Sequence, residues 1–468
     1  MEYRIERDTL GEVKVPKDAY YGAQTQRAVE NFKVSSLRLP RAFIRAQAVI
    51  KKAAAIANMA AGNLDKTIGE AIVKAADEVM AGKFDEHFVV DVFQAGAGTS
   101  QNMNINEILA ARASELLGGK RGDYSKVHPN DHANMSQSTN DTIHVAIHIS
   151  AYSEIHQSLL SSLKKLEEAL QEKAVEFDGI VKSGRTHLQD AVPMRLGQEF
   201  GGYAAMIRKG RKRVEKASEA LLELCIGGTA VGTGINTDPN YRRNALKAIN
   251  EITGYNFREP ENMFEAMQNL DAVVEVAGAL RVVVTSLRKI ADDLRLLSSG
   301  PRTGLAEIQL PPVQPGSSIM PGKVNPVLAE MLDMVCFQAL GCDTTLVTAG
   351  QAGQFELNVM MPVVAYNLLL EIQILSGGVN SFVDRCVTGI TANEKQCRLF
   401  AEKSAALATA LNPHIGYQKA AELAKEALAK DALIRDLVIS KNIMDKEKLE
   451  KILDVHAMTI DPAESEGD

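Results

Sequence analysis

Residues 316–326, with the sequence GSSIMPGKVNP, bring small, polar, cationic and helix-breaking side chains closer together than any other segment. Their two glycines allow successive backbone N–H groups to face one point, where negative charge is stabilised. Lys323 adds a fixed cation and Asn325 a further donor. A hydroxyl beside such donors, at Ser317 or Ser318, would lose its proton at a lower free-energy cost. The segment is therefore a candidate site for chemistry that passes through an anion.

Three other segments, 94–104, 126–141 and 183–190, are also rich in hydroxyl, amide and glycine residues. Each has an ordinary structural explanation, because Ser, Thr, Asn and Asp favour helix caps and turns. One of Ser138 to Asp141 is expected to cap the helix that follows, and a single histidine such as His187 is more often structural than catalytic. If the polar segments meet, they form one concave polar site on a rigid scaffold.

Two alternative chemistries lack the surroundings that they need. A Ser/His/Asp hydrolase would use similar residues, but the sequence has no G-x-S-x-G elbow and no strand to carry one. Residues 227–234 are glycine-rich, yet neither a preceding strand nor the Lys-Ser/Thr pair of a phosphate-binding loop accompanies them.

The polar segments interrupt long apolar, mostly proline-free stretches that predict helices. These expected helical stretches cover residues 41–82, 105–117, 142–192, 197–225, 262–299, 327–361 and 363–387. No alternating strand pattern of any length is present, so the fold class is predicted to be all-α, with helices long enough for several chains to associate side by side. Changes in composition near Thr139 and Thr391 predict three domains, 1–139, 140–391 and 392–468.

The bulk composition excludes several classes of function. The 468 residues include 52 basic and 59 acidic side chains, 5% aromatic residues and no Trp, which argues against nucleic-acid binding. Charges within the first ten residues argue against a secretory signal, and charges within 272–287 argue against a membrane span. The five cysteines form no C-x-x-C pair and are expected to be buried free thiols in a cytoplasmic protein.

Four ordered motifs carry a resemblance to a known family. GAGTSQNMN (96–104), NMSQSTND (134–141), GRTHLQDAVP (184–193) and GSSIMPGKVNP (316–326) resemble the aspartase/fumarase superfamily, specifically its branch of class II fumarases and aspartate ammonia-lyases. The resemblance extends from residues 18–25 to residues 412–417. It implies an almost all-helical, three-domain subunit whose long central helices form a homotetramer, with each active site built from three chains.

The resemblance also implies a mechanism, the anti elimination of a C4 dicarboxylic acid to fumarate. Ser317 would remove a proton next to one carboxylate, and loop amides and Lys323 would stabilise the resulting enediolate. His187 would lie near the leaving group, with Glu330 orienting its ring, although Glu330 could instead be a solvated helix charge. The substrate-binding residues implied by the resemblance are Thr99, Ser138, Thr139, Asn140, Thr186, Ser318, Lys323 and Asn325. No metal-ligand spacing is visible, and this chemistry needs no cofactor.

Within the superfamily, fumarases tend to read GSGTQTNMN and QSSND, whereas aspartases tend to read GAGTSxNMN and QSTND. The sequence here follows the second pattern, so we expect aspartate ammonia-lyase activity, with fumarate hydratase as the alternative. One departure is His144, which stands where the family usually has proline; it is either a structural replacement or a sign of a modified amine or substituted dicarboxylate substrate. A catalytically silent structural member is a third alternative, which the retained Ser317, His187, Lys323 and Asn325 disfavour.

Overall fold

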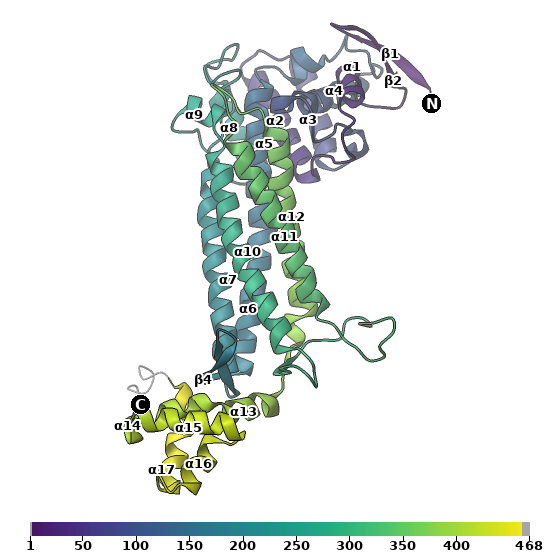
Figure 1. The fold of residues 1–468 in the computed structure, drawn as a ribbon. Coiled ribbons are helices and arrows are strands. Elements are labelled where there is room, and N and C mark those ends of the chain that lie inside the picture. The colour runs from purple at the N-terminus through teal and green to yellow at the C-terminus, as the bar shows by residue number, and fades with distance from the viewer. Residues whose placement is uncertain (1, 461–468) are drawn as a thin grey trace. The chain divides into compact units, whose positions relative to one another are not determined.

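The computed structural model describes residues 2–460, and these residues are mostly helical (Figure 1). The chain divides into two compact units, each assembled from three stretches of sequence. The first unit comprises Met1–Ser161, Lys212–Val284 and Phe337–Ser376. The second comprises Ser162–Arg211, Thr285–Cys336 and Gly377–Asp468. The long helices α7 (Leu196–Ser218), α10 (Asp271–Leu297), α11 (Val327–Gly350) and α12 (Met361–Arg385) contribute residues to both units.

The first unit is built around helix α2 (Arg41–Ala60), which packs against α3 (Lys66–Met80), α5 (Thr139–Glu154) and α8 (Tyr241–Thr253). Six of the thirteen buried residues of α2 are alanines, which allow neighbouring helices to approach closely. The remaining elements of this unit outside the long helices are β1 (Tyr3–Asp8), β2 (Gly11–Pro16), α1 (Ala23–Asn31), α3 (Lys66–Met80), η1 (Asp85–His87), η2 (Gly96–Gly98), α4 (Thr99–Leu116), η3 (Pro129–Ala133), α5 (Thr139–Glu154), η4 (Ile155–Leu159), η5 (Glu219–Leu222), α8 (Tyr241–Thr253) and α9 (Met263–Gln268).

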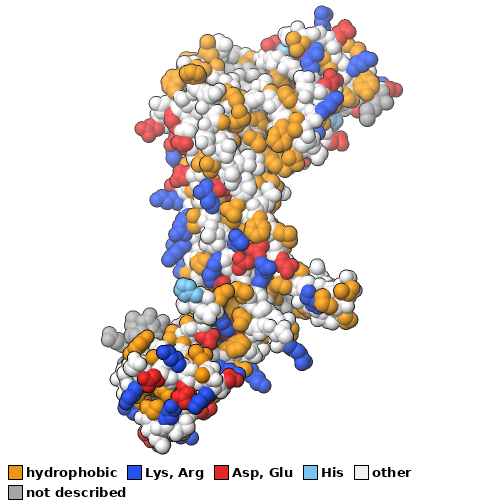
Figure 2. Space-filling model, in the orientation of Figure 1, with side chains coloured by type: hydrophobic (Ala, Val, Ile, Leu, Met, Phe, Trp, Pro, Cys, Tyr) orange, Lys and Arg blue, Asp and Glu red, His pale blue; other side chains and the backbone are white. Residues whose placement is uncertain are grey.

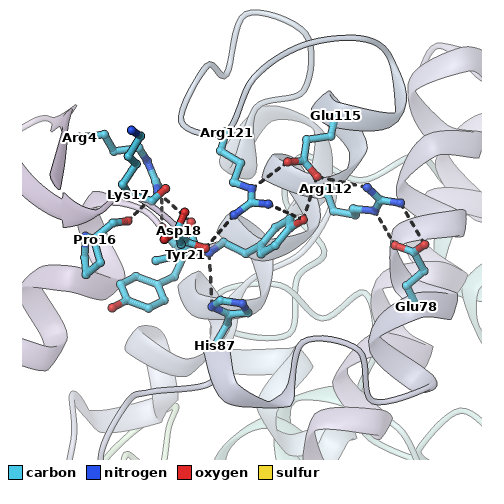
Figure 3. A network of polar contacts seen from close by, with 12 residues as sticks. Arg4, Pro16, Lys17, Asp18, Tyr21, Glu78, His87, Arg112, Glu115 and Arg121 are labelled. Carbon is cyan, nitrogen blue, oxygen red and sulfur yellow. Dashed lines mark hydrogen bonds and ion pairs between the residues drawn. The ribbon is translucent and has the colours of Figure 1, made fainter. Parts of the chain in front are cut away.

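A polar network fixes the N-terminal segment of the first unit to its helices (Figure 3). The Arg4 guanidinium donates to the backbone carbonyls of Pro16, Lys17, Ala19 and Tyr21. Arg121 donates to Glu115 and to the Asp18 carbonyl. The buried Glu107 carboxylate on α4 accepts from the backbone N–H groups of residues 22, 24 and 25, at the start of α1. A carboxylate in that position satisfies N–H groups that have no partner within the helix. Helix α4 is thereby held firmly at its middle.

The second unit contains α6 (Leu160–Glu176) and the hairpin formed by β3 (Val181–Thr186) and β4 (Gln189–Arg195). Hydrogen bonds join its helical segments, such as Tyr203 Oη to Asp293 Oδ2 at 2.7 Å and Asn380 Nδ2 to Ser162 Oγ at 2.9 Å. The smaller elements are β5 (Ile308–Gln309), η6 (Val387–Gly389), β6 (Thr391–Ala392), α13 (Glu394–Lys403), η7 (Ala405–Leu411), α14 (Asn412–Ile415), α15 (Tyr417–Lys430), α16 (Ile434–Ser440), α17 (Lys446–Ile452) and η8 (Ala457–Thr459). The helices after α13 share an apolar core with Ala401 of α13 and Val181 of β3, which also includes Leu411, Leu423 and Val438.

The prediction of a mostly helical chain is confirmed, but several expected bounds are wrong. The stretch 41–82 is two helices, separated by a turn in which Gly62 has a φ of 75°. The stretch 262–299 is divided into α9 and α10, and 327–361 is helical only as far as Gly350. The prediction missed the hairpins β1–β2 and β3–β4, so the polar stretch 183–190 is mostly strand and not an open loop. All five cysteines are free and buried, as predicted. Met361–Gly389 is apolar and long enough to span a bilayer, but 61% of its most apolar window is buried within the fold, as in a core helix. The division into three domains, 1–139, 140–391 and 392–468, stays a prediction.

Candidate active site

The N-termini of α4 and α5 meet in the first unit. Thr99 is the first residue of α4, and Gly98 before it has a φ of 81°; a Cβ there would lie 3.1 Å from Ile143 of α5. The Asn102 side chain on α4 donates to Thr139 Oγ1, at the start of α5, over 3.2 Å. The first N–H groups of a helix lack partners and carry partial positive charge. Two such ends beside exposed or half-buried hydroxyl groups form a natural binding site for a carboxylate.

Ser138 caps α5 through a reciprocal pair of bonds. Its Oγ accepts from the Asn140 backbone N–H over 3.2 Å, and Asp141 Oδ1 accepts from the Ser138 backbone N–H over 3.0 Å. The expectation that one of Ser138 to Asp141 caps this helix is therefore confirmed. The Ser138 hydroxyl helps to shape the segment, in addition to any contact with substrate.

A glycine-rich loop supports the start of α5 from behind. Asn140 Nδ2 donates to the Ala230 carbonyl over 2.8 Å, and Asp141 Oδ2 accepts from the backbone N–H groups of Gly227 and Thr229. Burial of Asp141 raises its pKa to about 7, against these hydrogen bonds, which favour the charged form. Sequence reasoning dismissed this loop as a phosphate site and did not find its role. The only sequence signal for this contact was Asp141, the acidic residue beside Asn140, because the loop that it binds lies about ninety residues further along the chain.

The β3–β4 hairpin in the second unit presents Thr186 and His187. His187 and Leu188 form its two-residue turn, with φ of 57° and 58°. The side chains of Thr186, His187 and Leu188 are all exposed. Hairpin turns of this kind require left-handed backbone, usually supplied by Asn or Gly. A histidine and a leucine in that conformation carry strain, and strained residues concentrate at functional sites.

Charged residues anchor this hairpin at its base. Arg185 donates to both oxygens of the buried Glu307, at 2.8 and 3.1 Å. Lys182 donates to Glu199 at 2.7 Å and lies 3.6 Å from Glu307. Two-point contacts between guanidinium and carboxylate fix direction as well as distance. His187 therefore stands on a rigid support, at the edge of a cavity of about 410 Å³ that Lys182, Arg185 and Leu188 also line.

The loop before α11 folds around Ser317. Ser317 Oγ accepts from the backbone N–H groups of Ile319 and Met320, at 3.2 and 3.0 Å. Two N–H groups aimed at one hydroxyl oxygen stabilise negative charge on that oxygen, so the geometry suits a serine that acts as an alkoxide base. Sequence reasoning predicted such donors, and the structure directs them at Ser317 and not at Ser318.

The same loop is closed by its glycines and by Asn325. Gly316 N donates to the Lys323 carbonyl over 2.9 Å, and Asn325 Nδ2 donates to the Gly316 carbonyl over 2.6 Å. A Cβ on Gly316 would lie 2.3 Å from the Lys323 carbonyl oxygen, and Gly322 has a φ of 79°. Part of the Asn325 amide is thus used to brace the loop. The Lys323 side chain is exposed and extends from this closed loop.

The predicted site residues fall into two groups. Thr99, Ser138, Thr139 and Asn140 lie in the first unit, and Thr186, His187, Ser317, Ser318, Lys323, Asn325 and Glu330 lie in the second. Glu330 is in the first turn of α11, and among residues 2–460 no hydrogen bond or ion pair joins it to His187. The pairing of these two residues stays a prediction. No cluster of three or more potential metal ligands occurs in the described part of the chain.

His144 is a buried neutral residue in this chain. Burial, with a contribution from the neighbouring His148, lowers the pKa of His144 to about 3. Its side chain is 2% exposed, and its ring lies 6.2 Å from that of His148 on the next turn of α5. A ring that stays neutral at physiological pH favours the structural interpretation of the replaced proline over a proton-transfer role.

Comparison with known proteins identifies the family. Residues 11–341 match the family described as Lyase, and residues 407–460 match the fumarase C C-terminus. The chain belongs to the aspartase/fumarase superfamily. It is 49% identical over 458 residues to the aspartate ammonia-lyase of Bacillus subtilis, covering 98% of this chain and 96% of that protein. It is 52% identical over 428 residues to the mitochondrial fumarate hydratase of Rhizopus oryzae, covering 91% and 86%.

Solved structures agree with this assignment. The crystal structure of a class II fumarase from Schistosoma mansoni is similar with a TM-score of 0.95 and 38% sequence identity, covering 98% of this chain and 99% of that one. The predicted resemblance to the superfamily and the predicted all-α fold are both confirmed. Because the relatives divide between ammonia-lyases and hydratases, membership of the superfamily identifies a lyase and leaves open which bond it breaks.

Proposed function

We propose that this protein is an aspartate ammonia-lyase, which reversibly eliminates ammonia from L-aspartate to give fumarate. The observation that carries the proposal is the orientation of Asn140. One N–H of its amide donates to the Ala230 carbonyl, and its Oδ1 accepts no hydrogen bond from the described chain. An ammonium group has three donors and no acceptor, so a free carbonyl oxygen suits it well. The hydroxyl leaving group of malate must in addition gain a proton to depart as water, and an amide oxygen cannot supply one.

The residues around Asn140 support the same substrate. The segments 96–100 and 137–141 read GAGTS and QSTND, the form that aspartases favour. In the structure these two segments lie at the adjoining N-termini of α4 and α5. We expect Thr99, Ser138 and Thr139 to hold a substrate carboxylate there, with the helix dipoles providing part of the attraction.

The proposed reaction begins at Ser317. As an alkoxide, Ser317 Oγ removes a proton from the carbon next to one carboxylate, and the electron pair moves into that carboxylate as an enediolate. Lys323 and the loop amides stabilise the added charge. The pair then returns to form the double bond, and the bond to nitrogen breaks with its electrons on the departing ammonia. We expect His187 to assist at the leaving group and Glu330 to orient its ring.

Fumarate hydratase is the second candidate. The 52% identity to the hydratase of Rhizopus oryzae favours it, because the two activities share every step except the group that leaves. Incubating the purified protein separately with L-aspartate and L-malate, and following fumarate by its ultraviolet absorbance, distinguishes the two. Turnover of L-aspartate supports the proposal, and turnover of L-malate alone defeats it. If neither compound is turned over, the alternative of a catalytically silent structural member of the superfamily is favoured.

We further propose that the protein works as a homotetramer with active sites shared among three chains. The loop around Ser317 exposes Ile319, Met320 and Val324, which are 83%, 47% and 51% exposed; Figure 2 shows hydrophobic side chains at the surface of this loop. Apolar groups exposed beside a reactive serine are typical of a surface that another chain covers. Mixing the variants Thr99→Val and Ser317→Ala, each of which we expect to lose activity alone, tests this, because shared sites regain activity when subunits exchange. If activity stays absent after verified exchange, the sites are not shared.

A further inference from the structure

Lys51 is a buried cation that the proposed mechanism does not use. It lies on α2 and is 1% exposed. Its Nζ donates to Asn134 Oδ1 over 3.0 Å and to Gln137 Oε1 over 2.9 Å, and within the described chain it forms no ion pair. Burying an ammonium group without a carboxylate partner costs free energy. Burial accordingly lowers the pKa of Lys51 to about 7.

The two acceptors of Lys51 belong to the segment that leads into α5. Asn134 Oδ1 also accepts from Asn102 Nδ2 and Asn106 Nδ2, each over 3.1 Å. Three donors directed at one oxygen fix the orientation of the Asn134 side chain. Asn102 Nδ2 in turn donates to Thr139 Oγ1 over 3.2 Å. A chain of hydrogen bonds therefore runs from the Lys51 ammonium to a hydroxyl of the carboxylate site.

Asp141 connects Lys51 to the other half of the same segment. Asp141 is the one charged group in the described chain that acts on the pKa of Lys51, and it raises that pKa against the effect of burial. The other helices that pack on α2 are α3, α4, α8 and η3, and none of their charged groups, Asp131 and His132 of η3 included, acts on the pKa of Lys51. Asp141 itself accepts from the backbone N–H groups of Ser138, Gly227 and Thr229. Lys51 and Asp141 therefore hold the segment 134–138 from its two ends, Lys51 through Asn134 and Gln137 and Asp141 through Ser138.

We propose that Lys51 is a positioning residue for substrate binding: its ammonium group holds residues 134–138 so that Thr139 and Asn140 face the substrate. The inference rests on the proposed function of Thr139 and Asn140 in binding a dicarboxylate. Lys51 does not touch the substrate in this account. Its loss therefore weakens binding and leaves the base, Ser317, in place.

The test compares Lys51→Met with Lys52→Met. Lys52 is the next residue of α2, and its Nζ pairs with Asp77 near the surface, so its loss controls for removing a lysine from this helix. In Lys51→Met we expect KM to rise on the order of 10- to 100-fold, the range for a lost hydrogen bond to a charged group, with kcat changed much less. In Lys52→Met both should stay within about twofold of wild type. A correctly folded Lys51→Met with an unchanged KM overturns the proposal.

A pH profile separates positioning from simple structural support. As the pH rises through about 7, folded Lys51 loses its proton, and we expect KM of the wild type to rise. In Lys51→Met that rise should be absent. In Asn134→Asp, a carboxylate opposite Lys51 holds the proton more tightly, so the rise should move to higher pH. An unshifted profile in Asn134→Asp contradicts the proposal, even if Lys51→Met fails to fold.

The dissociation constant for fumarate, measured by calorimetry over the same pH range, separates this inference from the proposed function. If neither L-aspartate nor L-malate is turned over, the proposed function fails, yet fumarate binding still reports on Lys51. Weaker fumarate binding in Lys51→Met than in Lys52→Met supports the positioning role. Equal binding in the two variants overturns it.

Discussion

Replacing Ser317 by alanine removes the proposed base and the acceptor for two backbone N–H groups. Ser317 Oγ accepts from residues 319 and 320 over 3.2 and 3.0 Å. Hydrogen bonds to a charged group contribute about 1.5–3 kcal/mol each, so the pair stabilises an alkoxide by roughly 3–6 kcal/mol. A positioned base typically accelerates a reaction ~10²–10⁴-fold. We therefore expect Ser317→Ala to lower kcat by at least ~10²-fold while KM changes little.

The assay is the initial rate of fumarate formation, with the oligomeric state of each variant checked by light scattering. Ser318→Ala is the matched control, because Ser318 is the adjacent serine and its hydroxyl receives no backbone N–H within the described chain. Its expected role in substrate binding predicts a higher KM and a smaller loss of kcat than in Ser317→Ala. If Ser317→Ala keeps kcat within tenfold of wild type, the base lies elsewhere.

Three further predictions concern the supports of the site. Glu307→Gln should lower the free energy of unfolding by about 3–5 kcal/mol, because it leaves Arg185 without its carboxylate partner, although Lys182 keeps Glu199. The exposed Glu172→Gln should change that free energy little, and equal denaturation midpoints for the two variants would contradict the prediction. Leu188→Gly should leave the free energy of unfolding unchanged or raise it by up to ~1 kcal/mol, since glycine relieves the strain of the left-handed backbone at this residue. A free energy of unfolding, measured with urea, that falls by more than ~1 kcal/mol would count against a strained turn. Between about pH 6.5 and pH 3, His144 binds a proton in the unfolded chain and not in the folded one, so the free energy of unfolding of the wild type falls as the pH falls. In His144→Leu that contribution is absent, so its free energy of unfolding should fall less over the same range. The exposed His414→Leu serves as the control, and an identical acid response in the two variants would refute the buried neutral ring.

The helices could be predicted because their signals are local. Apolar residues without proline mark 262–299, where the structure has α9 and α10, and 327–361, where α11 ends earlier than expected, at Gly350. The β3–β4 hairpin could not be predicted in the same way. Its first strand buries four consecutive residues, Lys182 and Ser183 among them, so no alternation is visible. Lys182 can be buried because it forms ion pairs with Glu199 and Glu307, and Glu307 lies far along the chain.

The candidate site shows the same division. The turn around Ser317 follows from glycine and proline spacing within eleven residues, so its amide donors were predictable. The cap at Ser138 follows from a four-residue pattern. Other supports could not be predicted, because they depend on helices and loops that only tertiary folding brings together. These are the hydrogen bond from Asn140 to Ala230 and the hydrogen bonds from Lys51 to residues 134–138. A buried lysine within an alanine-rich helix has no local signature, because exposed lysines are common in such helices.

Asn140 shows how the proposed preference for ammonia over water would be set by contacts behind the site. The side-chain amide of asparagine offers both donors and an acceptor, so its residue type alone is neutral between the two leaving groups. The Ala230 carbonyl takes one N–H and so orients the oxygen as an acceptor. The loop that carries this carbonyl is held by Asp141, whose carboxylate accepts from the backbone N–H groups of residues 227 and 229. Burial raises the pKa of Asp141 to about 7. Preference for an amine should therefore weaken when this loop is displaced, even if every residue that faces the substrate is retained.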